Sequence, residues 1–122
     1  MSLSTRHRCD GSSPDGVGIR PGAKPVTLAD WFTRLEKAPP PVNIATLAGF
    51  GSLLDESGVP YNRPASPQQM TAVSRLIDQA MSQGAFGVSL GMEYVPMISA
   101  TPLELETVAL AVGARDGVVM SH

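Results

Sequence analysis

Charged side chains are scarce in this sequence of 122 residues, at 16% against roughly 25% in a typical soluble domain. The net charge is −2 without a basic stripe, which argues against a nucleic-acid partner. Long apolar runs are missing too: no stretch approaches the ~18 residues of a membrane span, and residues 1–8 lack the apolar core of a signal peptide. We therefore expect one small globular domain or a piece of a larger one, with no membrane partner.

Cysteine and histidine are also rare. Cys9 is alone, which excludes an intramolecular disulfide and suits a reducing compartment, so we expect a cytoplasmic protein. The two histidines are His7, which lies between arginines in what reads as a solvated tail, and His122. Three such side chains are few for a closed metal site.

Turn-forming residues fill the N-terminal part. Residues 1–26 show no sustained hydrophobic period, and the stretch 9–16 is dense in glycine, serine, proline and aspartate. We predict an irregular segment over residues 1–26, followed by a folded segment over residues 27–122.

Three helices are predicted by their start signals. The first runs over residues 27–37 and ends at three prolines. Ser66 and Thr101 each precede a proline and stand three residues before Gln69 and Glu104, the pattern of a capping box. These boxes predict helices over residues 66–83 and 101–115. The side chains expected on the buried faces of these two helices are Met70, Val73, Ile77, Ala80 and Met81, then Leu105, Val108, Ala109 and Val112.

Short apolar strands are predicted between the helices, over residues 42–48, 86–90 and 118–120. Apolar rather than alternating strands joined by helices indicate a parallel sheet, so the fold class is α/β. Met70, Met81 and Met120 are expected in the core. The last strand is followed only by Ser121 and His122, and so few units cannot close a barrel of eight. Two interpretations stay open: a small open sheet, and a partial barrel segment of about three strands.

One motif favours a serine hydrolase. Gly87-Val88-Ser89-Leu90-Gly91 matches G-x-S-x-G, in which the serine is a nucleophile on a sharp strand-to-helix turn. Asp116 and His122 follow in a suitable order for a triad, but residues 92–96 lack a helix start. Ser89 is therefore an alternative nucleophile.

Other candidates lie at the ends of predicted strands. His122 stands where parallel α/β sheets place their chemistry, which suits a metal ligand or a general base, although a C-terminal histidine can equally be exposed and idle. Glu93 and Tyr94 follow another strand and either line a pocket or belong to a loop surface. Asp10 precedes a glycine, which is the pattern of an ordinary turn.

Taken together, several stretches resemble the N-acyl-D-amino-acid deacylases, the D-aminoacylase branch of the amidohydrolase superfamily. The most specific are AMSQGAFGVSLGMEY (80–94) and GVVMSH (117–122), supported by LADWFTRL (28–35), PPVNIA (40–45) and SPQQM (66–70). The resemblance covers roughly residues 9–122. It implies a segment of a metal-bearing TIM barrel whose one or two divalent ions, usually zinc, activate water to attack an N-acyl amide.

The resemblance also implies roles for single residues. His122 matches a strand-end histidine that binds metal. Asp10 takes the place of a metal-bridging cysteine before a glycine, with Cys9 one residue earlier, and Glu93 and Tyr94 keep the family pattern. Departures are equally clear: the paired histidines, a later histidine and a later general-base aspartate have no counterpart, and Met97 replaces a usual glycine.

We therefore predict a segment of a metal-dependent amidohydrolase acting on N-acyl-D-amino acids, inactive as an isolated chain and prone to self-association. Its metal would be zinc in a full-length parent, and its substrate an N-acyl amino acid. The alternatives are a non-catalytic remnant or interaction module of the same fold and, third, the serine hydrolase with Ser89.

Overall fold

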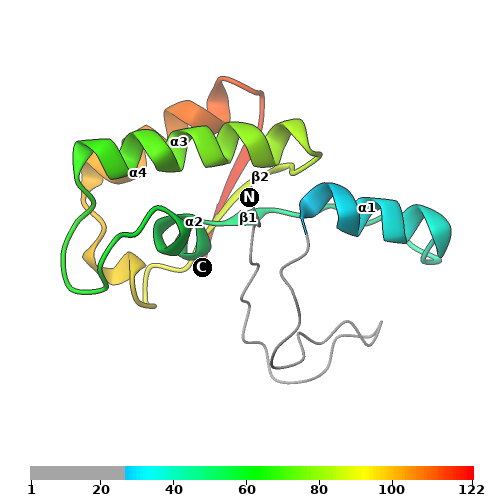
Figure 1. Cartoon of the computed structure of the whole chain (residues 1–122), viewed down its shortest axis with the longest axis horizontal. Coiled ribbons are helices and arrows are strands. Elements are labelled where there is room, and N and C mark those ends of the chain that lie inside the picture. The colour runs from blue at the N-terminus through cyan, green and yellow to red at the C-terminus, as the bar shows by residue number, and fades with distance from the viewer. Residues whose placement is uncertain (1–26) are drawn as a thin grey trace.

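A computed structural model describes residues 27–122 of the chain as an α/β unit with helices packed against a parallel sheet. In chain order its elements are α1 (Leu28–Lys37), β1 (Ala48–Gly49), α2 (Phe50–Glu56), α3 (Pro67–Ser82), β2 (Gly87–Leu90), the short 3-10 helix η1 (Met97–Ser99), α4 (Pro102–Gly113) and β3 (Val118–Ser121). The three strands lie in the order β1-β2-β3, all parallel. Figure 1 shows α3 and α4 side by side along one side of the strands, with α1 extending away from them. The predicted α/β class and partial-barrel organisation are confirmed.

None of the helices between residues 27 and 122 has the length and apolarity that crossing a membrane requires.

Both predicted capping boxes are formed. The Ser66 Oγ accepts from the Gln69 N–H at 3.3 Å, and the Gln69 Oε1 accepts from the Ser66 N–H at 2.9 Å. Thr101 and Glu104 make the same reciprocal pair at the start of α4. Each pair satisfies helix-terminal N–H groups that would otherwise lack a partner. The two helices begin where the sequence predicts, and they end at Ser82 and Gly113.

Glu104 does more than cap its own helix. Only 4% of this residue is exposed, and its Oε1 accepts a hydrogen bond from the Ala65 N–H at 2.7 Å. Its Oε2 accepts from the N–H and the Oγ1 of Thr101, at 2.6 and 2.7 Å. A buried carboxylate is tolerated when hydrogen bonds replace its hydration. The residue therefore ties the start of α4 to the segment that leads into α3.

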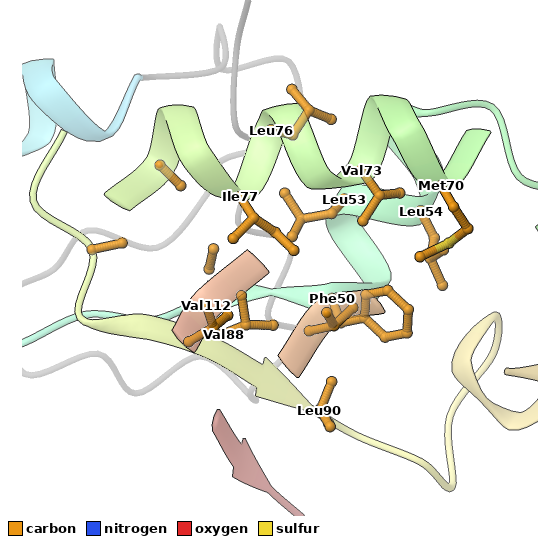
Figure 2. Packing of buried hydrophobic residues seen from close by; sticks show 14 of the residues in the cluster. Phe50, Leu53, Leu54, Met70, Val73, Leu76, Ile77, Val88, Leu90 and Val112 are labelled. Atoms are coloured by element: carbon orange, nitrogen blue, oxygen red, sulfur yellow. The ribbon is translucent and has the colours of Figure 1, made fainter. Parts of the chain in front are cut away.

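The hydrophobic core lies between these helices and one face of the sheet. Figure 2 shows side chains from α2 and α3 filling this space, together with Val88 and Leu90 of β2. The largest fully buried side chains are Phe50, Leu53, Leu54, Ile77, Val73, Val88, Val108 and Val112. Because side chains alternate along a strand, Ser89 points to the opposite face of the sheet from Val88 and Leu90.

The prediction for residues 42–48 is wrong over most of its length. Only Ala48 pairs with β2, joined by Gly49, and Val42 is 66% exposed. Ahead of Ala48 one further backbone bond joins the two segments, from the Phe86 N–H to the Thr46 carbonyl at 2.9 Å, and residues 42–45 pair with no strand among the described residues. Directly after Gly49 the chain forms α2, a helix that the sequence did not predict.

The expected burial of β3 is also wrong. The strand forms as predicted, but all four residues are exposed, and Met120 is 58% exposed rather than in the core. Among the described residues β2 pairs with one edge of this strand, and the side chains of β3, which point to the two faces of the sheet, are not covered by the core. Met70 is buried and Met81 partly so, as expected. On α4, Ala109 is exposed, contrary to expectation.

Candidate functional site

The carboxyl ends of the three strands lie along one edge of the sheet, because the strands are parallel. β1 runs directly into α2 there, and β2 runs into the turn that begins at Gly91. His122 follows β3 and continues its pairing, since its backbone N–H donates to the carbonyl of Leu90 at 2.8 Å. This backbone contact holds the predicted metal-ligand candidate at the edge where parallel sheets place binding sites.

Tyr94 lies beside His122. The centroids of the two rings are 6.0 Å apart, and the ring planes are tilted by 40°. The turn that carries the phenol is held by two backbone bonds: the Tyr94 N–H donates to the Gly91 carbonyl at 3.0 Å, and the Ile98 N–H donates to the Tyr94 carbonyl at 2.9 Å. Two residues that are 28 positions apart in the sequence thus form one exposed pair, with Tyr94 57% accessible.

Glu93 precedes Tyr94 on the same turn and is exposed. It makes no hydrogen bond or ion pair with the residues from 27 to 122. Its carboxylate therefore remains available at the edge of the site.

The geometry around Ser89 does not support a nucleophile elbow. Within the part of the chain that the structure describes, β2 is followed by a turn and then η1, so no helix N-terminus faces the serine. Asp116 lies in the turn before β3 and His122 follows the last residue of the strand, so the two side chains belong to opposite ends of β3. The three residues of the suggested triad are not brought together. Ser89 stands opposite Met120 on the sheet face that lacks the core.

The metal-ligand set is incomplete in residues 27–122. His122 is the single histidine of this range, and no group of three or more His, Cys, Asp or Glu side chains there is placed to hold a metal ion. Zinc takes at least three protein ligands in catalytic sites. These residues therefore fit one ligand position and not a whole metal centre. Asp10, Cys9 and His7 lie outside the described residues.

Sequence reasoning missed the packing that supports this edge. Met97 stood out only as a departure from a family pattern, Gly91 only as the last residue of the G-x-S-x-G match, and Gly51 was not singled out. In the structure Met97 packs against both glycines, and Tyr94 packs against Gly91. No spacing in the sequence signals this contact.

The parallel strands and the helices that cover them define a segment of an α/β protein, with a histidine at the end of one strand. No protein-family profile matches the chain. It is 31% identical over 95 residues to a D-aminoacylase of Alcaligenes xylosoxydans xylosoxydans, a match covering 78% of this chain and 20% of the relative. A crystal structure of D-aminoacylase, described as defining a novel subset of amidohydrolases, superposes with a TM-score of 0.71 at 30% identity, covering 78% of this chain and 20% of that one.

A second solved structure extends the likeness. The N-acyl-D-glutamate deacylase of Bordetella bronchiseptica, complexed with zinc and a phosphonate inhibitor, superposes with a TM-score of 0.74 at 26% identity. The match covers 83% of this chain and 22% of the deacylase. The chain is thus a homologue of the D-aminoacylases and N-acyl-D-amino-acid deacylases, as its motifs predict, and it spans about a fifth of their length.

Proposed function

We propose that this chain is the part of a metal-dependent N-acyl-D-amino-acid deacylase that supplies one metal ligand and one wall of the substrate pocket. The observation that carries the proposal is the pairing of His122 with Tyr94 at the carboxyl edge of the sheet, in a homologue of D-aminoacylase. The substrate class is an N-acyl-D-amino acid, and the reaction is hydrolysis of its amide.

His122 would bind the metal through one ring nitrogen, with its backbone N–H already fixed to Leu90. A divalent ion in such a site polarises the acyl carbonyl and lowers the pKa of a bound water. The described residues offer one ligand position, so the other ligands would come from the rest of the enzyme. Asp10 remains a weaker proposal for a second ligand.

Tyr94 and Glu93 would face the substrate. A phenol can donate a hydrogen bond to a carbonyl or carboxylate oxygen, and the exposed position of Tyr94 leaves its hydroxyl free to do so. The carboxylate of Glu93 would repel an acidic substrate side chain and attract a basic one. The pair therefore suits orientation of the substrate beside the metal.

A chimera tests this function. Residues 27–122 replace the homologous segment of the Alcaligenes D-aminoacylase, and hydrolysis of N-acyl-D-amino acids and zinc content are measured. The chimera is expected to retain zinc and turnover. His122→Ala is expected to lower the turnover more than about 100-fold, since mutating even a residue that hydrogen-bonds to a metal ligand lowers metal affinity or activity by about 10–100-fold. The isolated chain with added zinc is expected to give no turnover.

Tyr94→Phe is the test variant and Tyr61→Phe is its matched control, because both tyrosines are exposed and Tyr94 is the one that lies beside His122. Tyr94→Phe is expected to raise KM or lower kcat, and Tyr61→Phe to change neither. A folded chimera that keeps full zinc content and activity after His122→Ala would show that this histidine is not a metal ligand.

Self-association is the second part of the proposal. Among residues 27–122, β3 is paired on one side only, with β2, and all its residues are exposed, while Leu103 and Leu110 of α4 are exposed too. An unpaired strand edge next to apolar surface is a template for another chain. In the absence of the longer protein, a second copy of this chain is the partner that we infer.

Light scattering at tens of micromolar is expected to show an oligomer. Val118→Lys should shift the population toward monomer, because a lysine on an edge strand opposes pairing. Val42→Lys is the control, since Val42 is also an exposed valine and lies outside the sheet. A monodisperse monomer of the unaltered chain, with a cooperative melt, would contradict the inference.

A cytoplasmic location is likewise proposed. Its support is the single cysteine, which suits a reducing compartment.

A further inference from the structure

The ring of Tyr94 packs against Gly91. A Cβ added to Gly91 would lie 2.9 Å from the Cδ2 of Tyr94 and 3.2 Å from the Cε of Met97. Real Cβ atoms essentially never approach a neighbour at less than 3.0 Å. The missing side chain of Gly91 therefore makes room for the phenol ring to lie close to the end of β2, on the side where His122 is found.

The side chain of Met97 also contacts Gly91. Its Sδ lies 3.2 Å from the backbone N–H of Gly91 and accepts a hydrogen bond from it. A thioether is a weak acceptor, but its unbranched chain can follow an irregular surface and fill a gap beside backbone. Met97 thus binds the first residue after β2 with its own side chain.

Gly51 provides the opposite wall for Met97. A Cβ on this residue would lie 3.2 Å from the Cε of Met97 and 3.6 Å from the Cδ of Pro96. Gly51 is in the first turn of α2, directly after β1. The Met97 side chain is therefore enclosed between the ends of two neighbouring strands, with a glycine on each side.

We propose that Gly91 and Met97 are positioning residues that place the Tyr94 phenol against the His122 ring. Gly91, which has no side chain, leaves room for the Tyr94 ring to pack against the backbone. Met97 fills the space between the ends of β1 and β2 and so fixes the turn. The inference rests on the proposed function, in which Tyr94 orients the substrate beside a metal held by His122. Neither residue touches the substrate in this scheme.

The contact between the two rings can be measured without metal or substrate. An aromatic ring shifts the resonances of protons near it, so Tyr94 should displace the Cδ2 and Cε1 proton signals of His122. The spectra are recorded at pH about 8, above the ordinary histidine pKa of about 6.5. His7, the other histidine, is identified by its loss in His7→Ala. The shift difference between the unaltered chain and Tyr94→Leu measures the contact.

Gly91→Ala and Met97→Ala are each expected to remove most of that difference. Gly51→Ala, whose nearest neighbours are Met97 and Pro96, should remove a smaller part. Gly113→Ala is the matched control, because nothing lies within 4 Å of a Cβ there, and it should keep the whole difference. Far-UV circular dichroism verifies folding in every variant, and Met97→Ala decides the matter if Gly91→Ala unfolds.

The proposal is overturned if folded Gly91→Ala and Met97→Ala retain the full shift difference, or if the unaltered chain does not differ from Tyr94→Leu. This result is separate from the proposed function. An inactive chimera would leave a positive shift result standing, and an active chimera with unchanged shifts in these variants would remove the positioning role alone.

Discussion

Replacing Gly87 with alanine is expected to lower the free energy of unfolding by more than about 4 kcal/mol, a loss reserved for severe steric or burial defects. Gly87 has a φ of 154°, and an added Cβ would lie 1.8 Å from the carbonyl oxygen of Val118 and 2.7 Å from its nitrogen. These are backbone atoms of the paired strand, and they cannot rotate away. The methyl group would force β2 and β3 apart where the Val118 N–H donates to the Phe86 carbonyl at 2.9 Å.

Two other glycines separate the causes of this loss. Gly58 has a φ of 70° with nothing within 4 Å of a Cβ, so Gly58→Ala should cost only the backbone strain, on the order of 1 kcal/mol. Gly113→Ala meets neither constraint and should be neutral or slightly stabilising. Urea unfolding at one protein concentration compares the three. Equal losses in Gly87→Ala and Gly58→Ala would show that the close approach to Val118 is not the cause.

Phe50→Ala is expected to destabilise the chain by about 3–5 kcal/mol, the usual range for removing a buried aromatic ring. Phe50 is fully buried at the first position of α2, and Figure 2 shows its ring within the core near β2. The loss combines the transfer of apolar surface with a cavity that the helices cannot collapse to fill. The midpoint of urea unfolding measures it.

Phe86→Ala provides the matched control, because the Phe86 side chain is of the same type and 62% exposed. Its removal should change the free energy of unfolding by less than about 1 kcal/mol, as for surface positions in general. Similar losses at both positions would contradict the burial of Phe50.

Local signals were sufficient to predict the long helices. The capping boxes at Ser66 and Thr101 depend on residues three positions apart, so their hydrogen bonds can be predicted without knowledge of the fold. α2 was missed because it has seven residues and no side-chain cap at Gly49. Its formation depends on tertiary packing of Phe50, Leu53 and Leu54, which a local pattern does not contain.

Burial in the sheet could not be predicted for a related reason. An apolar sequence such as Val118–Met120 fits a buried strand, but its side chains point to the two faces of the sheet, and their exposure depends on what covers those faces. In the described residues the core does not cover β3, so its side chains remain accessible. The sequence pattern reports what the strand can bury, whereas the neighbours decide what it does bury.

The candidate site was predictable in its parts and not in its assembly. The strand-end rule pointed to His122 and to the turn carrying Glu93 and Tyr94, but ring proximity requires the register of β2 against β3. The packing of Met97 against Gly91 was beyond prediction, since a thioether acceptor has no characteristic sequence spacing. The roles of these side chains remain proposals, together with that of Asp10.

The carboxylate of Glu104 makes the two helix starts cooperative. It caps α4 and at the same time accepts from the backbone of Ala65, which lies 39 positions earlier and directly before the cap of α3. Local opening at the start of α4 therefore releases a buried charge from its partners and also frees the segment entering α3. Segments that open together form one unit of local stability. Opening at one helix start is therefore expected to weaken the other, because both share the Glu104 carboxylate.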